Sequence, residues 1–138
     1  MAKNPNQNLN PTPSKREPST REPSTRERGL SAELKVRQAL EAGGYHFVES
    51  NFQWKGGEID LVFVDALGVL VFVEVRSAAA ASPWLRYTIT PAKQRRLINT
   101  ALRYRMARTS TSGRRAFRFD MVWVEGDHFE HWKNVMMV

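Results

Sequence analysis

The amino-acid sequence predicts an α/β fold in which a mixed β-sheet is flanked by helices, in the order αβββαββ. Three observations support this prediction. Two neighbouring segments, Glu58–Asp65 and Val69–Arg76, alternate their side chains at the period of a β-strand. A Thr90-Pro91 pair opens a long helical segment, because proline suits the first helical position. Strand-like segments on both sides of that helix are typical of a mixed sheet.

Each predicted element has a recognisable boundary. Ser31 suits the N-cap of a first helix, and Gly43-Gly44 ends that helix. The glycines near Gln53–Gly57 mark a turn, and Ala66-Leu67-Gly68 forms a hairpin loop. We expect a helix from Ser31 to Glu41, strands over Tyr45–Asn51, Glu58–Asp65 and Val69–Arg76, a helix from Thr90 to about Arg108 that buries Leu97, Ile98, Ala101 and Leu102, a break at Thr109–Gly113, and strands over Ala116–Val124 and His128–Trp132.

The chain divides into two regions of different composition. Its 138 residues are enough for one domain. Residues 1–28 are rich in Asn, Pro, Ser, Thr, Arg and Glu, and they repeat the pentapeptide Arg-Glu-Pro-Ser-Thr. Such a segment buries too little apolar area to offset its chain entropy, so we expect a disordered basic tail. The folded domain is expected over residues 29–138.

Composition excludes several classes of function. The chain has no cysteine, which removes disulfides, thiolate zinc sites and cysteine nucleophiles and fits a reducing, cytoplasmic location. No apolar run approaches the roughly 18 residues of a membrane span, and no secretory signal is expected.

Basic and acidic residues are segregated along the chain. The formal net charge is +7, from 21 Lys and Arg against 14 Asp and Glu. From Val75 to Phe119 there are eleven bases and no acid, which favours contact with a polyanion over a merely solvated helix. The candidate nucleic-acid-binding residues are Arg86, Lys93, Arg95, Arg96, Arg103 and Arg105.

Two acidic residues are expected to face each other across the hairpin. If Ala66–Gly68 is a three-residue loop, Asp65 pairs with Val69, and Asp60 then lies opposite Glu74. Facing carboxylates repel each other, and an unpaired charge among apolar residues is costly. Either a divalent cation or an ion pair with Arg76 resolves the conflict, and the geometry does not choose between them.

These residues belong to a pattern that resembles a known family. Gly29-Leu-Ser-Ala-Glu33, Asn51, Gly57-Glu-Ile-Asp-Leu61, Phe72-Val-Glu-Val-Arg76 and Arg118-Phe-Asp120 are similar to the YraN family of small bacterial proteins. That family in turn resembles the PD-(D/E)xK nuclease superfamily, which includes archaeal Holliday junction resolvases. The resemblance covers about Gly29 to Val138, and its two central blocks are specific in combination.

The resemblance implies a restriction endonuclease-like core and assigns roles to residues. Glu33 is the additional acid on the first helix, and Asp60 and Glu74 are ligands of Mg²⁺ or Mn²⁺ together with the Val75 carbonyl. Arg76 occupies the position of the superfamily lysine, and Gln94 lies where some relatives place a polar residue near the active site. Mg²⁺ prefers oxygen ligands, and it activates water and offsets charge at a phosphodiester. Arginine stays protonated, so Arg76 binds phosphate but does not serve as a general base.

Two functions therefore follow as alternatives. The first is a metal-dependent nuclease acting on DNA, with branched or junction DNA as the implied substrate and, by analogy with junction-cleaving relatives, a homodimer as one oligomeric state. The second is a non-catalytic nucleic-acid-binding module that retains the nuclease fold, which Arg76 favours.

Five other residues have less specific signals. Trp54 and Trp84 fall in expected loops, where aromatic rings stack on bases, although aromatic residues more often belong to the core. Asp120 is interpreted as a structural partner for an arginine. His128 and His131 are three apart on a strand and are interpreted as surface histidines rather than a zinc pair.

Overall fold

The computed structural model describes residues 21–77 and 89–136, and the predicted tail over residues 1–20 lies outside that range. Its elements follow the predicted order, with one extra short helix. They are α1 Thr25–Ala42, β1 His46–Trp54, β2 Gly57–Val64, β3 Leu70–Ser77, α2 Pro91–Ala107, α3 Thr109–Ser112, β4 Phe117–Glu125 and β5 His128–Trp132. The five strands form one sheet in the order β1-β2-β3-β4-β5. Only the β3–β4 pair is parallel, so the predicted α/β fold with a mixed, restriction endonuclease-like sheet is confirmed.

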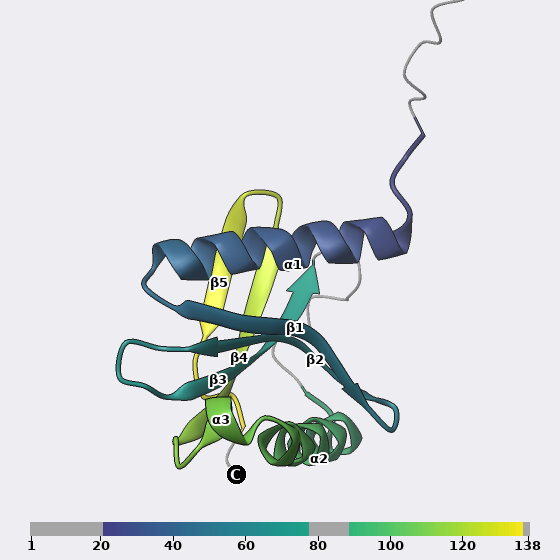
Figure 1. Ribbon diagram of the computed structural model, residues 1–138. Helices are drawn as coiled ribbons and strands as arrows, with labels where there is room; N and C mark the ends of the chain where they lie inside the picture. Colours follow the sequence, from purple (N-terminus) through teal and green to yellow (C-terminus); the bar gives the residue numbers. More distant parts are fainter. Residues whose placement is uncertain (1–20, 78–88, 137–138) are drawn as a thin grey trace, which may run out of the picture.

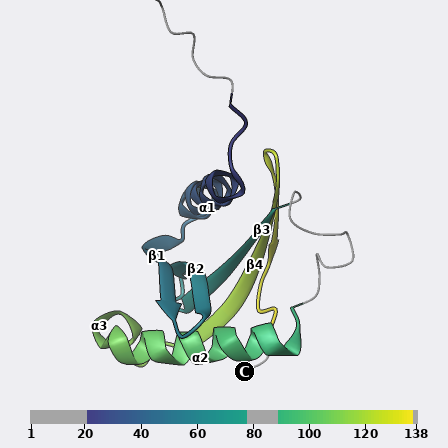
Figure 2. The same cartoon turned by 90° about the vertical axis from the view of Figure 1, so that its right-hand side faces the viewer.

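The sheet separates two hydrophobic layers. Helix α1 covers one face and α2 lies against the other, as Figures 1 and 2 show from perpendicular directions. Val36 and Leu40 of α1 pack on the first face with Phe63 of β2. Leu97 and Tyr104 of α2 pack on the second. Each layer excludes water from one side of β2 and β3, which accounts for the nearly continuous apolar sequence of both strands.

Helix α1 begins six residues before the predicted start. Ser24 is its N-cap: the Ser24 hydroxyl accepts from the Glu27 N–H at 3.2 Å, and the Glu27 carboxylate accepts from the Ser24 N–H at 2.7 Å. This reciprocal pair is a capping box, which satisfies two amides at the helix end. The predicted N-cap at Ser31 is therefore wrong, and Thr25–Arg28, which we assigned to the tail, are helical.

The first hairpin has a tighter turn than predicted. Strand β1 continues through Gln53 to Trp54, and only Lys55 and Gly56 connect it to β2. Both turn residues have positive φ, 39° and 77°. A two-residue turn with this handedness matches the twist of the flanking strands, so pairing extends to the end of the hairpin.

Helix α2 starts where the sequence predicts. Thr90 caps it by accepting from the Lys93 N–H at 3.2 Å, and Pro91 is its first residue. Its buried side is formed by Leu97, Thr100, Ala101 and Tyr104. Leu102, predicted to be buried, is 46% exposed, because it lies off the stripe that positions 97, 101 and 104 define. The predicted break after this helix contains the single turn α3, followed by Gly113 with φ 48°.

The alternation of β2 breaks at Asp60. Leu61 and Phe63 pack in the α1 layer as expected, but Ile59 packs in the α2 layer with Val62. On the neighbouring strand, Asn51 lies between the pairs Ser50–Leu61 and Phe52–Ile59 and has φ 55°. A left-handed residue inside a strand turns the pleat over, so side chains before and after this point face opposite layers. The regular alternation predicted for Glu58–Asp65 would put Ile59 on the face of Leu61, so the prediction is wrong at this point.

The sheet also forks at this point. The β2–β3 ladder has the predicted register but ends at the Leu61–Val73 pair. Beyond it, β2 continues beside β1 as far as Gly57, and β3 continues beside β4 as far as Ser77. The Val75 N–H, which has left the ladder, donates instead to Asp60 Oδ2 at 2.8 Å. Asp60 and Glu74 thus occupy the first unpaired positions on the two sides of the fork.

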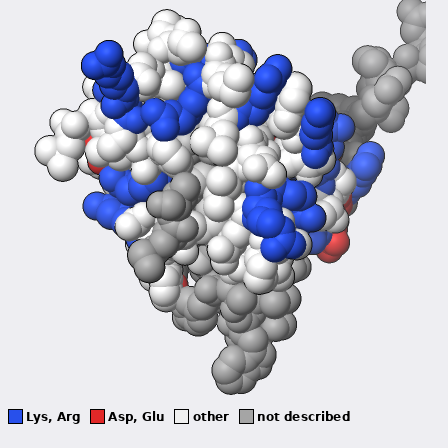
Figure 3. Space-filling view, turned by 90° about the horizontal axis from the view of Figure 1, so that it is seen from below, with Lys and Arg blue, Asp and Glu red and all other residues white. Residues whose placement is uncertain are grey.

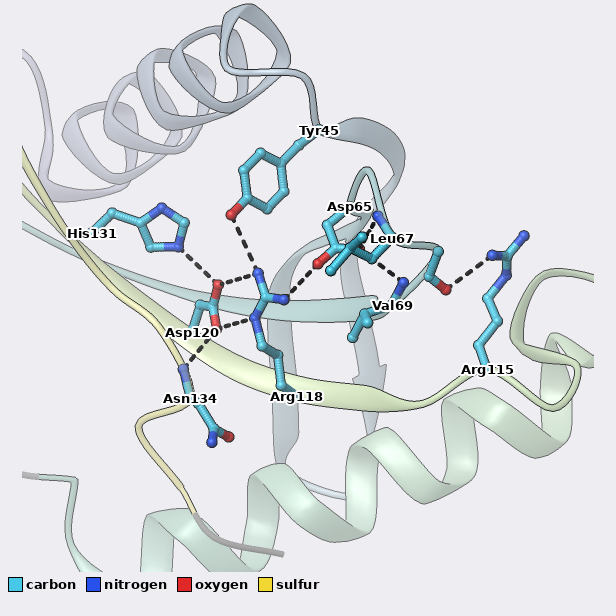
Figure 4. Close-up of polar contacts among 10 residues, drawn as sticks. Tyr45, Asp65, Leu67, Val69, Arg115, Arg118, Asp120, His131 and Asn134 are labelled. Atoms are coloured by element: carbon cyan, nitrogen blue, oxygen red, sulfur yellow. Dashed lines mark hydrogen bonds and ion pairs between the residues drawn. The ribbon is translucent and has the colours of Figure 1, made fainter.

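A buried polar network ties the other end of the sheet together (Figure 4). Arg118 on β4 donates to Asp120 at 2.9 Å, to Asp65 at 2.6 Å and to the Tyr45 hydroxyl at 3.2 Å. Asp120 also contacts His131 Nε2 at 2.8 Å and accepts from the Asn134 N–H at 2.9 Å. Burial alone would raise the pKa of Asp120, but these hydrogen bonds hold it below its usual range. The predicted role of Asp120 as a structural partner is confirmed, and His131 is its second partner rather than a simple surface residue.

Within residues 21–77 and 89–136, no helix combines the length and apolar character needed to cross a membrane.

The contact between α2 and the start of β2 gives a test of this packing. A Cβ atom at Gly57 would lie 2.0 Å from Thr100 Oγ1 and 3.1 Å from the Arg96 carbonyl oxygen. We expect Gly57→Ala to lower the free energy of unfolding by about 1–3 kcal/mol, because the helix must move away. Thr100→Ala in the same chain should recover part of the loss. Chemical denaturation of the wild type, the two single variants and the double variant measures the coupling free energy between positions 57 and 100.

The control is Gly29→Ala, at a helical position with no atom within 4 Å of the added Cβ. It should be neutral or stabilising by about 0.5–1 kcal/mol. Equal losses at positions 29 and 57 would contradict the close approach of α2.

Candidate metal centre

Three carboxylates from two elements converge at the fork. Glu33 comes from α1, Glu58 and Asp60 come from β2, and one oxygen from each lies within 4.8 Å of the others. Glu33 and Asp60 are half-buried and Glu58 is exposed. The reversed pleat explains this convergence, since it turns the start of β2 out of the regular alternation. Glu33 and Asp60, to which the resemblance assigns roles in one site, thus lie close together in the structure.

Asn51 connects two of these acids. With its amide oriented to donate, its nitrogen lies 3.3 Å from Glu33 Oε2 and 2.9 Å from Glu58 Oε1. The residue that reverses the pleat therefore also holds two carboxylates. Its hydrogen bond to Glu33 opposes the rise in the pKa of that group, which burial and then the charge of Glu58 produce.

Glu74 faces the same space from β3 and contacts a lysine of α2. The Glu74 side chain is 10% exposed, and its Oε1 accepts from Lys93 Nζ. Together these residues line an open hollow of about 180 Å³, which we call the carboxylate hollow. Its lining comprises Gly56, Gly57, Glu58, Asp60, Glu74, Lys93, Arg96 and Leu97.

Asp60 is electrostatically the most perturbed member. Burial, followed by the charge of Glu74, raises the pKa of its carboxyl from 3.8 to about 8, although the hydrogen bond from Val75 lowers it. Lys93 contacts Glu74 in the hollow. The acids thus repel one another more than their neighbours compensate, and burial of such a charge is unfavourable without a further cation.

The donor set fits a hard divalent cation. Glu33, Glu58 and Asp60 offer only oxygen atoms from adjacent carboxylates, the ligands that Mg²⁺ and Mn²⁺ prefer. The raised pKa values of Glu33 and Asp60 have the physical origin expected of ligands that lack their ion, namely burial and repulsion by neighbouring carboxylates.

Three residues predicted for this site lie differently. The Val75 N–H donates to Asp60. The role of the Val75 carbonyl oxygen as a metal ligand stays a prediction. Arg76 pairs with Trp123 in the β3–β4 register and is not among the residues that line the carboxylate hollow. Gln94 donates to the Ile89 carbonyl at 2.9 Å and so holds the entry to α2.

The predicted nucleic-acid-binding residues divide into groups. Lys93 and Arg96 line the carboxylate hollow, and Arg95 is exposed on the same helix. Arg103 lies 4.0 Å from the ring centre of Trp54. Arg105 lies over Phe117 and donates to the Arg115 carbonyl, away from the hollow. Arg86 and Trp84 fall outside the described residues.

The face formed by α2 carries this basic character. Seen from below, it displays several blue groups of Lys and Arg and very little red (Figure 3). The basic helix thus borders the acidic hollow, so the two signs of charge meet where Lys93 contacts Glu74.

Glu58 and the second role of Lys93 were not predicted from the sequence. Glu58 lies two residues before Asp60 in the Gly57–Leu61 block, so alternation already places the two side chains on one face, and this signal could have identified Glu58. Lys93 looked like one base among many. Its position depends on how α2 packs on Gly57, which sequence periodicity does not encode.

The architecture and the site define a mixed-sheet α/β protein with an oxygen-rich acidic centre beside a basic helix. Residues 32–124 match the profile of the family described as "Uncharacterised protein family UPF0102". A UPF0102 protein of Ralstonia pickettii (strain 12J) is 42% identical over 106 residues, covering 74% of this chain and 83% of the relative. One of Coxiella burnetii (strain RSA 331 / Henzerling II) is 39% identical over 113 residues, covering 80% and 92%. The chain belongs to the UPF0102 family, which is the YraN family predicted from its motifs.

The raised pKa of Asp60 predicts how stability depends on pH. Because the folded-state pKa of about 8 exceeds the ordinary 3.8, the folded protein holds a proton that the unfolded chain releases across this interval. The free energy of unfolding of the metal-free protein should therefore decrease as pH rises from about 4 to about 8. Asp60→Asn, which keeps an acceptor for Val75, should stabilise the protein at pH 8.5 by at most about 5 kcal/mol.

Thermal unfolding in EDTA at pH 5 and pH 8.5 measures this difference. The advantage of Asp60→Asn should be much smaller at pH 5. Glu41→Gln, at the exposed end of α1, is the matched control and should show no such pH dependence. An equal advantage for Asp60→Asn at both pH values would contradict the assignment.

Proposed function

We propose that this protein is a divalent-metal-dependent nuclease that hydrolyses phosphodiester bonds in DNA, with branched or junction DNA as its substrate. The observation that carries the proposal is the convergence of Glu33, Glu58 and Asp60 at the fork of the sheet, next to Glu74 and a basic helix. The resemblance to the PD-(D/E)xK superfamily, stated from the motifs, implies the same reaction.

The charge arrangement favours a catalytic role over simple binding. A surface that only binds a polyanion gains nothing from acids beside its basic helix, because they repel phosphate. Asp60 and Glu74 nevertheless lie close enough for the charge of Glu74 to raise the pKa of Asp60. A cation held between the acids would remove the repulsion and attract the phosphate.

The chain's own residues have distinct tasks in this proposal. Asp60, Glu58 and Glu33 hold the metal, and Asn51 fixes the orientation of the last two. A bound Mg²⁺ or Mn²⁺ would supply Lewis-acid polarisation of the phosphate and lower the pKa of the attacking water. Arg96, at the rim, binds the flanking phosphate. Hydrolysis forms a bond from the water oxygen to phosphorus and breaks one phosphorus–oxygen ester bond, and the proton from water passes to the departing alcohol.

Lys93 takes the place that the superfamily pattern gives to the residue at position 76. Its ammonium contacts Glu74 inside the carboxylate hollow, whereas Arg76 is not among the lining residues. A compact ammonium on a flexible stem can hold Glu74 and also donate to a phosphate oxygen or a water. We therefore assign the positioning of the reacting groups to Lys93 and leave phosphate binding outside the hollow to Arg76.

A non-catalytic nucleic-acid-binding module is the second candidate function. The arginine at position 76, where the pattern has lysine, favours it. Calorimetric titration with Mg²⁺ or Mn²⁺ discriminates between the two candidates. Metal binding that is present in the wild type and lost in Asp60→Ala supports a metal centre. If neither protein binds the metal, the acids form an ion cluster without a metal.

Cleavage of branched and flap DNA is the deciding measurement. With Mg²⁺ or Mn²⁺, we expect Asp60→Asn and Glu74→Gln each to lower the cleavage rate by about 10²-fold or more, because Asp60 holds the metal and Glu74 supplies negative charge beside it. DNA affinity should stay the same or increase, since a negative charge is removed. The protein should be purified from a nuclease-deficient host.

Glu41→Gln again serves as the control and should cleave at the wild-type rate. Activity that persists unchanged in Asp60→Asn would indicate a contaminant or a different site, and the assignment would then be wrong.

Lys93 and Arg76 give a second, independent comparison. Lys93→Met should lower cleavage by about 10-fold to 10³-fold, because it removes the ammonium beside Glu74 while keeping the length of the side chain. Arg76→Lys should retain or increase activity, since it keeps the positive charge. Single-turnover cleavage with saturating DNA separates these effects from binding. A loss of activity in Arg76→Lys with full activity in Lys93→Met would assign the role to Arg76 instead.

A further inference from the structure

A second hollow lies beside the carboxylate hollow at the tip of the β1–β2 hairpin. It has an open volume of about 500 Å³ and is lined by Gln53, Trp54, Lys55, Gly56, Gly57 and Glu58. We call it the hairpin hollow. Gly56, Gly57 and Glu58 line both hollows, so the two hollows are adjacent. A volume of this size is within the range of sites that hold small organic groups.

The main aromatic surface of the hairpin hollow is Trp54, the last residue of β1. Trp54 is half-buried and, among the described residues, is absent from both hydrophobic core clusters. The Arg103 guanidinium lies 4.0 Å from the ring centre, and Lys55 Nζ lies 5.3 Å away. Arg103 belongs to α2, which packs closely on Gly57, so this contact fixes the indole beside the helix.

The two cations around Trp54 differ in how firmly they are held. Arg103 is half-buried on a regular helix, whereas Lys55 is exposed in a two-residue turn. A long exposed lysine is displaced from an aromatic face at little cost, since such contacts contribute only about 0.5–1 kcal/mol. The indole can therefore accept another flat group, with Arg103 and Lys55 nearby to attract the phosphates attached to that group.

We propose that the hairpin hollow binds an unpaired nucleobase, stacked on Trp54, from the same strand whose phosphodiester enters the carboxylate hollow. The inference rests on the proposed function and names its substrate class. Every base has a π-face, so stacking on an indole needs no particular sequence, and Lys55 and Arg103 attract the flanking phosphates. Bases inside an intact duplex are already stacked and cannot enter. The site therefore favours overhangs, flaps and branch points over continuous duplex.

The competing explanation is a purely structural contact, in which Arg103 and Lys55 pack on Trp54 to stabilise the hairpin. The two explanations differ in what a substitution changes. A structural contact affects stability, and through it affects all DNA ligands alike. A base-binding site affects ligands with unpaired bases and leaves duplex binding unchanged.

The test is equilibrium binding of two labelled DNAs of equal length, one fully duplex and one with a single-stranded overhang. Fluorescence anisotropy is measured in EDTA at fixed low salt, so that no cleavage takes place. Trp54→Leu should weaken overhang binding about 10-fold, consistent with about 1–3 kcal/mol per stacked base, and leave duplex binding within about twofold. Trp54→Phe should retain most of the preference, because phenylalanine keeps a stacking face.

Trp132→Leu is the matched control, since Trp132 lies on β5 and is 38% exposed. It should leave both affinities unchanged. A second readout avoids any effect of substitution on folding: 5-iodouracil in the overhang of DNA bound to the wild-type protein should photocrosslink to Trp54, as located by mass spectrometry.

Equal loss of duplex and overhang affinity in Trp54→Leu would overturn the proposal, as would crosslinking only outside the hairpin hollow or equal wild-type affinity for both DNAs. The proposed nuclease function fails by a different result, namely no cleavage with metal. A preference for overhangs that depends on Trp54 but comes without cleavage would support the base site and refute the catalytic proposal.

Discussion

At Asn51 and Asp60, where β1 and β2 lie side by side, the strands change which side chains they present to each helix. Asn51 has φ 55°. On the neighbouring strand, Ile59 and Leu61, on either side of Asp60, pack in opposite layers. The reversal coincides with the end of the β2–β3 ladder, so the sheet opens where Asp60 is located. In a regular strand Glu58 and Asp60 would lie on the face opposite Leu61, away from α1 and Glu33, and pairing with β3 would continue to Val75. The acidic centre depends on this departure, and Asn51 stabilises it through both its backbone conformation and its amide.

Asp120 and Asp60, two acids within the described part of the chain, show opposite electrostatic balance. Asp120 is 1% exposed, yet Arg118, His131 and the Asn134 N–H satisfy it, and its pKa is lowered. The pKa of Asp60 is raised because burial and Glu74 outweigh the single hydrogen bond from Val75. The first arrangement stabilises the fold, which loses that contribution as pH falls through the lowered pKa. The second destabilises the metal-free fold as pH rises. Such a destabilising group is typical of a functional site, where a bound cation removes the repulsion.

Sequence patterns predicted those features that depend on local chemistry. The three-residue loop set the register of the β2–β3 hairpin, and Thr90-Pro91 set the start of α2. The earlier start of α1 was also encoded, in the Ser24–Glu27 capping box, and was missed because the surrounding composition is typical of a tail. The reversed pleat was not predictable from alternation, since it depends on one left-handed residue in the neighbouring strand. Glu58 and Lys93 could not be placed without it, because their positions follow from how the strands fork and how α2 packs on them.

Gly57 determines how closely α2 packs on β2 at both hollows. Because it has no Cβ, Thr100 and the Arg96 carbonyl lie against its backbone, and α2 sits closer to β2 than any larger residue would permit. That distance brings Lys93 to Glu74 and Arg103 to Trp54, so one contact positions cations at both hollows. A basic helix held farther away would still attract DNA, since long-range attraction depends weakly on distances of an ångström. The contacts of Lys93 with Glu74 and of Arg103 with Trp54 would be lost by such a displacement. The close packing at Gly57 is therefore better explained by the geometry of a site than by the general attraction of a basic surface for a polyanion.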